Sequence, residues 1–179
     1  YDSRVAGATG CGIYTSADVG TTSKLVYTTN SAIAASSTNT IKHYCWTHVA
    51  VTRSSGTVRG FLNGVLEFTV TDSRTFSSSA ATYIATDISP QYFNGYINDA
   101  RILKGTAQYT SAFTPPTAPL TAITNTSLLT TQYNGAGNNN GFKDSSQNNF
   151  VITRNGNTTQ GTFSPVSYTH LTLPTILRV

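Results

Sequence analysis

The sequence predicts an all-β protein folded as a two-sheet antiparallel sandwich. Only 10% of the 179 residues are charged, and Ser, Thr, Asn and Gly are abundant, which favours short strands and turns over amphipathic helices. The stretch from Trp46 to Thr71 indicates three strands, separated by Ser54-Ser55-Gly56 and by Asn63-Gly64. Because Asn-Gly is a strong signal for a two-residue hairpin turn, we expect these strands to run antiparallel.

The third of these strands shows a period of two. From Leu66 to Thr71, apolar Leu, Phe and Val alternate with Glu, Thr and Thr. Successive side chains of a strand point to opposite faces of the sheet. One face of this strand is therefore predicted to be apolar and the other to be exposed to solvent.

Other β-rich runs lie on both sides of this region. Upstream, strands are predicted around Cys11–Thr15, Ser23–Thr29 and Thr38–His43. Downstream, a β-rich run covers Ala81–Asp87 and a long strand covers Tyr92–Leu103. Residues 105–120 contain several prolines, which cannot donate to a sheet ladder, so this segment is expected to close the module rather than to form a central strand.

Two motifs resemble one known family. The segment Trp46–Arg53, with its Trp-x-His-Val-Ala pattern, a Gly turn and then Asn63-Gly64, resembles the central hairpin of laminin G-like, concanavalin A-like lectin modules. A second segment, Phe93–Ile102, is similar to the late Gly-x-Ile-x-Asp-x-Arg-Ile strand of that family. The resemblance implies a jelly-roll sandwich, and similar Ser/Thr/Asn-rich modules occur in marine phage structural and tail-fibre proteins and in bacterial surface proteins.

The resemblance also implies a division of the chain. Residues 1–124 correspond to the central and C-terminal part of one module, and residues 125–165 to the start of a following repeat in a tandem array. In this second part, strands are predicted at Ser127–Tyr133 and at 148–154, with an Asp144-Ser145-Ser146 turn between them. Because an uncovered sheet edge is costly, one hypothesis is that these strands fold back and complete the sandwich by circular complementation.

The last stretch, 166–179, calls for a different interpretation. Val166–Thr175 looks like the translation of a transposase-adapter oligonucleotide used in sequencing libraries. We therefore expect residues 166–179 to be an adapter-derived tail rather than native sequence, and the chain to be a metagenomic fragment.

Catalysis is not expected. Sandwich glycosidases carry alternating acids on one strand, because two carboxyl groups must face the same substrate. Glu67 is the single glutamate, its neighbours Val65 and Thr69 are not acidic, and no two aspartates lie within two residues of each other. A degenerate sandwich glycosidase is therefore a disfavoured alternative.

The charge distribution and the lack of a long apolar run argue against nucleic acid and membranes as partners. The net charge is +4, but the basic residues are scattered along the chain, whereas nucleic-acid binding usually gathers them on one face. No apolar run is long enough to span a bilayer. We therefore expect neither nucleic-acid binding nor membrane insertion.

Cys11 and Cys45 form either one disulfide or two unrelated thiols.

Candidate binding residues lie near the long downstream strand. Sugar recognition uses aromatic rings that stack on pyranose faces and amides that bond to hydroxyls, and Tyr92, Asn94, Tyr96 and Asn98 offer both. Taken one by one, these residues are better explained by ordinary sheet and turn roles. No cofactor is expected, although the resemblance implies a calcium site in many members, for which Asp87 and Asp99 are the best available pair.

The function expected from these patterns is binding rather than catalysis. The chain is predicted to be a non-catalytic glycan-binding or adhesion module of a larger virion or cell-surface protein. Its partners would be surface glycans or a protein surface, and its location extracellular or on a virion. The alternative is a purely structural spacer or decoration module.

Overall fold

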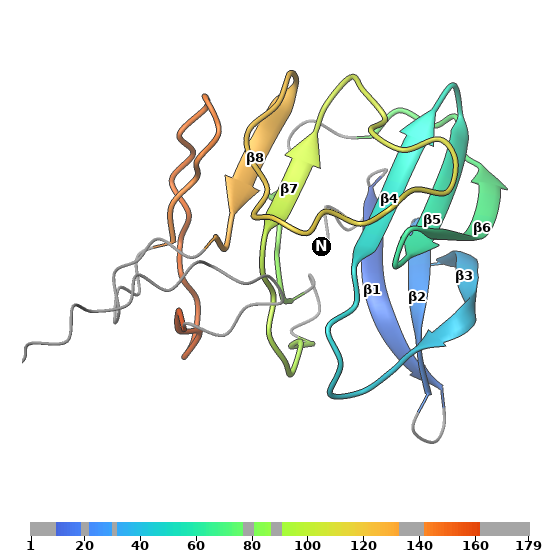
Figure 1. Cartoon of the computed structure of the whole chain (residues 1–179), viewed down its shortest axis with the longest axis horizontal. Coiled ribbons are helices and arrows are strands. Elements are labelled where there is room, and N and C mark those ends of the chain that lie inside the picture. Colours follow the sequence, from blue (N-terminus) through green and yellow to red (C-terminus); the bar gives the residue numbers. More distant parts are fainter. Residues whose placement is uncertain are drawn as a thin grey trace, which may run out of the picture. The chain divides into compact units, whose positions relative to one another are not determined.

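The computed structural model describes residues 10–18, 22–29, 32–76, 81–86, 91–132 and 142–161. Within these residues the chain forms eight β-strands and no helix (Figure 1), which confirms the predicted all-β class. Consequently, no helix in this part of the chain is long and apolar enough to cross a membrane. The chain divides into two compact units, Tyr1–Gly95 with Lys104–Pro115 and Tyr96–Leu103 with Pro116–Val179.

The first unit contains two three-stranded antiparallel sheets. One sheet has the order β1-β2-β3, with β1 at Cys11–Asp18, β2 at Thr22–Thr29 and β3 at Ala32–Ile41. The other has the order β4-β5-β6, with β4 at Val49–Ser54, β5 at Thr57–Leu62 and β6 at Val65–Thr71. The sheets form two layers that approach each other most closely at β3 and β6 (Figure 1), so the predicted two-sheet sandwich is confirmed.

Both hairpins of the second sheet turn as the sequence predicts. Ser55 and Gly56 have φ of 48° and 75°, and Asn63 and Gly64 have φ of 49° and 81°. Two successive positive φ values define a type I′ turn, whose twist matches that of the flanking strands. The Asn63 carboxamide oxygen also accepts a hydrogen bond from the backbone N–H of His48 at 2.9 Å, which ties the turn to the residue before β4.

The core of the first unit lies between the two sheets. Its buried apolar side chains come mainly from the central strands β2 and β5: Leu25, Val26, Tyr27, Val58, Phe61 and Leu62. In β2 every residue from Leu25 to Thr29 is at most 5% exposed. Since neighbouring residues of a strand point to opposite faces, both faces of this central strand are covered.

The segment from Lys104 to Pro115 packs on the second sheet. The rings of Tyr109 and Phe113 stack at 3.5 Å, and both meet the buried Phe61 ring edge-on. Thr52 donates its hydroxyl to the carbonyl of Tyr109 at 2.7 Å, and the N–H of Phe113 donates to the carbonyl of Gly64 at 3.0 Å. The segment contains no strand, as predicted, and its aromatic rings cover Phe61.

The alternation predicted for β6 is wrong at its start. Phe61 pairs with Leu66, whereas the preceding Gly60 pairs with Phe68, so Glu67 is the extra residue of a β-bulge. A bulge shifts the inward–outward phase of a strand by one residue. As a result Leu66 is 43% exposed and Glu67 only 9% exposed, the reverse of the expected pattern.

Glu67 uses its buried carboxylate to join the two sheets. Asn39 of β3 donates its backbone N–H to Oε2 at 2.8 Å and its side-chain amide to Oε1 at 3.1 Å. The N–H of Asn39 is available because the register between β2 and β3 shifts between Lys24 and Val26. Ser37 fills the gap in that ladder, since its hydroxyl accepts a hydrogen bond from the N–H of Leu25 at 3.0 Å.

A second buried acid, Asp72, follows β6 and contacts the first sheet. Its Oδ2 accepts the Tyr27 hydroxyl at 2.8 Å, and Arg74 binds both carboxylate oxygens at 2.9 and 3.0 Å. The hydrogen bond from Arg74 is the main reason that the pKa of Asp72 falls to about 2, with burial acting in the opposite direction. Burial and the bond to Asp72 together raise the pKa of Tyr27 far above its usual value.

Several predicted strands are shorter than expected or absent. The Trp46–Arg53 strand begins only at Val49, and the Thr38–His43 strand is the end of a longer β3 that stops at Ile41. Of the predicted Tyr92–Leu103 strand only Ala100–Leu103 forms, because the preceding Asp99 has a left-handed φ of 54°. In Ala81–Asp87 the described residues form no strand, and Thr86 makes an isolated bridge to Tyr92.

The second unit is built on one antiparallel pair, β7 (Ala100–Leu103) and β8 (Thr126–Thr130), with Arg101 opposite Leu129. The predicted strand at 148–154 is wrong: residues 142–161 contain no strand, and Asn149 has a φ of 48° that interrupts extended structure. The circular complementation hypothesis stays a prediction. Residues 166–179 lie outside the described residues.

Replacing Gly64 with alanine tests the contact between the second hairpin and Phe113. A Cβ at this position would lie 1.8 Å from the Phe113 carbonyl oxygen, in addition to the strain of φ +81°. We expect Gly64→Ala to lower the free energy of unfolding of the first unit by roughly 2 kcal/mol or more in chemical denaturation. Gly105→Ala is the matched control, because Gly105 has φ +89° but no atom within 4 Å of the added Cβ. Equal losses in the two variants would contradict the predicted clash.

The pH dependence of stability tests the role of Asp72. Its pKa in the fold, about 2, lies below the ordinary value of 3.8, so its stabilising contribution is complete above the ordinary value and is lost as the pH falls towards 2. Asp72→Asn should therefore be less stable than the unmodified chain at neutral pH, and the difference should narrow through this acidic window. Denaturant midpoints measured across the window check this, and a difference that stays constant would refute it.

Candidate functional site

Tyr92 and Asn94 form the part of the predicted binding set that lies in the first unit. Tyr92 is 77% exposed, and its backbone is positioned by the bridge to Thr86. The next residue, Phe93, donates its N–H to the carbonyl of Ala85 at 2.8 Å. The exposed Tyr92 ring and the exposed Asn94 amide therefore sit in a segment with defined backbone contacts.

Tyr96 and Asn98, the other two predicted binding residues, belong to the second unit. Tyr96 is 70% exposed, while the Asn98 amide donates to Oδ2 of Asp99 at 2.6 Å. The expected arrangement of all four residues along one strand is wrong, because the strand begins only at Ala100. Their role in ligand binding stays a prediction, and Tyr92 with Asn94 is the pair that lies within a single unit.

Asp99, one of the two predicted calcium ligands, is hydrogen-bonded to the backbone of its own unit. Its Oδ1 accepts the backbone N–H of Leu120 at 3.2 Å, and its own N–H donates to the carbonyl of Thr131 at 3.3 Å. Burial raises the pKa of its carboxyl, and hydrogen bonds from Leu120 and Gln132 partly offset this effect. Asp87 lies outside the described residues, so calcium binding stays a prediction. Where the chain is described, no three His, Cys, Asp or Glu side chains gather to hold a metal.

The cysteines do not form a disulfide in the structure. Both Cys11 and Cys45 are thiols, the first partly buried and the second exposed. The structure therefore shows two separate thiols, which is one of the two alternatives that the sequence left open.

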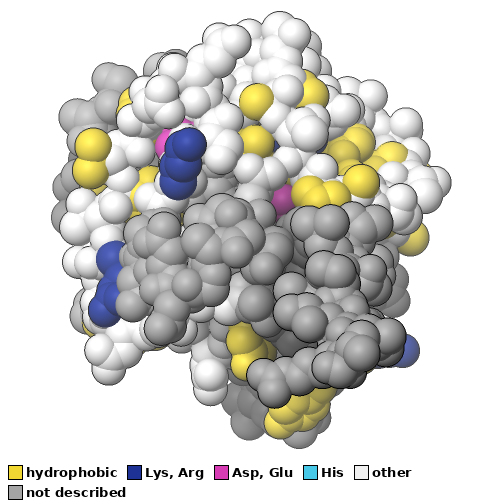
Figure 2. Space-filling view, turned by 60° about the vertical axis from the view of Figure 1, so that its left-hand side comes forward, with side chains coloured by type: hydrophobic (Ala, Val, Ile, Leu, Met, Phe, Trp, Pro, Cys, Tyr) yellow, Lys and Arg dark blue, Asp and Glu magenta, His cyan; other side chains and the backbone are white. Residues whose placement is uncertain are grey.

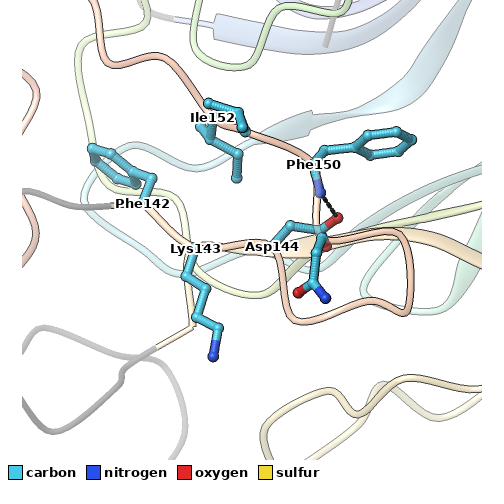
Figure 3. Close-up of a pocket in the computed structure, with 7 residues that line it drawn as sticks. Phe142, Lys143, Asp144, Phe150 and Ile152 are labelled. Atoms are coloured by element: carbon cyan, nitrogen blue, oxygen red, sulfur yellow. Dashed lines mark hydrogen bonds between the residues drawn. The ribbon is translucent and has the colours of Figure 1, made fainter.

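A cavity of about 280 Å³ in the second unit was not predicted from the sequence (Figure 3). It is lined by Phe142, Lys143, Asp144, Asn149, Phe150, Val151 and Ile152. Figure 3 shows Phe142 and Ile152 on one side of the 142–144 backbone, whereas Lys143 extends to the other side. The cation and these two apolar side chains therefore do not face a ligand from the same side.

Asp144 organises the backbone around this cavity. Its Oδ1 accepts the N–H groups of Leu129 at 3.0 Å and Ser146 at 2.8 Å, and its Oδ2 accepts the Ser146 hydroxyl at 2.8 Å and the N–H of Phe150 at 3.0 Å. Burial opposes ionisation of this carboxyl, which is 2% exposed, but these hydrogen bonds outweigh it and lower its pKa. The Asp144-Ser145-Ser146 pattern predicts this turn, although not the cavity beside it.

The same turn covers the open edge of β8. Leu129 receives a hydrogen bond on its carbonyl from the N–H of Ser145 at 2.7 Å, and the side chain of Asn148 donates to the carbonyl of Ser127 at 2.9 Å. With the bond from Leu129 N–H to Asp144, these contacts satisfy backbone groups that an exposed edge would otherwise offer to another strand.

The acids share one property that bears on chemistry. Each of the four whose contacts are described above accepts hydrogen bonds from groups that hold the fold together: Glu67, Asp72, Asp99 and Asp144.

On the face of the molecule in Figure 2, the Lys and Arg side chains lie apart from one another rather than in one patch.

The comparison with protein families supports the resemblance noted in the sequence. Residues 2–109 match a laminin G model described as the concanavalin A-like lectin/glucanases superfamily. The matched range covers more than half of the chain and includes β1 to β6. No curated protein and no solved structure matches the chain.

Substituting Asp144 with asparagine tests whether the turn depends on a carboxylate. An amide replaces one acceptor oxygen by a donor, which would then face the groups that donate to Asp144. We expect a loss of about 1–3 kcal/mol for each buried donor left without an acceptor, and faster hydrogen exchange of the Leu129 amide. Asn148→Ala is the control, because it removes a more exposed hydrogen bond to the same strand. Unchanged exchange at Leu129 in Asp144→Asn would argue against this role.

Proposed function

Because the chain belongs to the concanavalin A-like lectin/glucanase superfamily, in which laminin G-like modules are commonly non-catalytic binding modules, we propose that it binds glycans. In this proposal it is an adhesion module of a larger virion or cell-surface protein, and its partner is a surface glycan. The observation that carries the proposal is the exposed ring of Tyr92 in a segment held by backbone bonds to Ala85 and Thr86.

The geometry around Tyr92 suits sugar recognition. A pyranose ring has an apolar face that stacks on an aromatic side chain, and its hydroxyls need amide or carboxylate partners. Tyr92 offers the ring, and Asn94, two residues later and exposed, offers an amide. A backbone that is already positioned lowers the entropic cost of ordering the site when the ligand binds.

Hydrolysis has less support, although the superfamily includes glycosidases. A glycosidase needs two carboxyl groups on either side of the scissile bond, and one of them must either attack the sugar as nucleophile or activate a water as base. Glu67 is largely buried and both of its oxygens accept hydrogen bonds from Asn39, while Asp72 is bound by Arg74 and Tyr27. These acids stabilise the sandwich, which favours binding over catalysis.

The competing hypothesis is a spacer that has no ligand. The two hypotheses differ in whether the exposed tyrosine contributes to an interaction. A spacer would leave Tyr92 as one of several exposed aromatic side chains, comparable to Tyr44 on the same unit.

Mutation of Tyr92 separates these hypotheses. The full chain is first screened on an array of neutral and acidic polysaccharides, and affinities for the best ligand are then measured by calorimetry. We expect Tyr92→Ala to weaken binding about tenfold, since an aromatic contact contributes roughly 0.5–1.5 kcal/mol beyond its buried area. Tyr44→Ala, which removes a fully exposed tyrosine elsewhere in the first unit, should leave the affinity unchanged. Absence of binding across the array would favour the spacer, whereas equal losses of affinity in the two variants would contradict the role of Tyr92.

A further inference from the structure

Of the three Asn-Gly pairs in the described part of the chain, two occupy contrasting positions. The pair Asn63-Gly64 forms the turn between β5 and β6, whereas Asn94-Gly95 lies in an exposed bend outside any strand. We propose that Asn94 is a site of spontaneous deamidation, which converts its neutral side-chain amide into a carboxylate, and that Asn63 is protected from the same reaction by the fold.

The reaction requires only the chain and water. The backbone nitrogen of Gly95 attacks Cγ of Asn94, the new N–Cγ bond closes a five-membered succinimide, and the Cγ–Nδ2 bond breaks. Ammonia leaves with the proton that the Gly95 nitrogen loses. Water then opens the ring at either carbonyl, giving aspartate or isoaspartate, and no oxidant or reductant takes part.

The surroundings of Asn94 permit this ring closure. Asn94 and Gly95 are both exposed, and no hydrogen bond to the described residues holds the Asn94 side chain. Gly95 has no side chain to hinder the attacking nitrogen. A Cβ there would lie 2.8 Å from the Phe93 ring, so the local packing accommodates glycine best.

The surroundings of Asn63 oppose the same step. Its side-chain oxygen accepts the N–H of His48 at 2.9 Å, and its own N–H donates to the carbonyl of His48 at 2.8 Å. Gly64 is buried against the Phe113 carbonyl. Bringing Cγ of Asn63 onto the Gly64 nitrogen would break the first of these bonds and move a packed turn, so the turn must open locally before it can react.

The consequence for binding rests on the proposed function. Deamidation places a negative charge two residues from Tyr92, in the segment proposed to contact sugars. Like charges repel, so the modified chain should bind sulfated or carboxylated glycans less well and neutral glycans about equally.

Peptide mapping tests the chemistry without reference to any ligand. The full chain is held in mildly alkaline buffer, and conversion at each asparagine is followed by mass spectrometry. We expect Asn94 to convert at least about tenfold faster than Asn63, which corresponds to a barrier lower by about 1.4 kcal/mol. Gly95→Ala should slow conversion at Asn94 and leave Asn63 unchanged. Conversion of Asn94 no faster than that of Asn63 would overturn the proposal.

A second measurement isolates the binding consequence. Asn94→Asp and the unmodified chain are compared on immobilised neutral and sulfated galactans. Weaker retention of the variant on the sulfated galactan alone supports the effect of charge, and equal retention on both overturns it. Failure to bind either galactan would count against the proposed function, whereas the mapping result would stand on its own.

Discussion

The packing of the two sheets in the first unit depends on the buried carboxylates of two residues, one on β6 and one just after it. Removing a carboxylate from water is costly unless donors replace its hydration, so each buried acid fixes the groups that it contacts. Glu67 requires Asn39 of β3, and Asp72 requires Tyr27 of β2 and Arg74. Apolar burial between the sheets is non-directional, and these polar contacts specify which strands meet where the two layers approach.

The same constraint bears on function. The superfamily supports both lectins and hydrolases, so the distinction lies in what the acids of a given chain contact. A carboxylate that accepts hydrogen bonds from the other sheet cannot reorient towards a substrate without weakening the sandwich. The groups left for recognition are side chains that the core does not need, and Tyr92 is one of these, with most of its surface exposed and its backbone held.

Local signals in the sequence were sufficient for the turns and for most of the sandwich. Asn63-Gly64 predicts a type I′ turn because Asn and Gly tolerate positive φ, and both residues have it. Other features depend on contacts between distant residues. The bulge at Glu67 forms where Asn39 supplies donors from another sheet, and β7 begins only after Asp99, whose carboxylate accepts a bond from Leu120. No periodicity within one strand contains that information, and the contrast between the exposed Tyr92 and the buried Tyr27 is likewise set by tertiary packing.

Asp144 shows that a buried carboxylate can also arrange the strands of a different architecture. In the first unit, buried carboxylates join two sheets, and in the second a buried carboxylate covers the edge of a two-stranded pair by accepting the N–H of Leu129 in place of a neighbouring strand. The side chain thus performs the role of a backbone carbonyl, and a short polar turn satisfies an edge that would otherwise need another strand. In both units the acids whose contacts the structure describes contribute to strand arrangement, and for that reason the proposed glycan recognition is expected to use aromatic and amide groups.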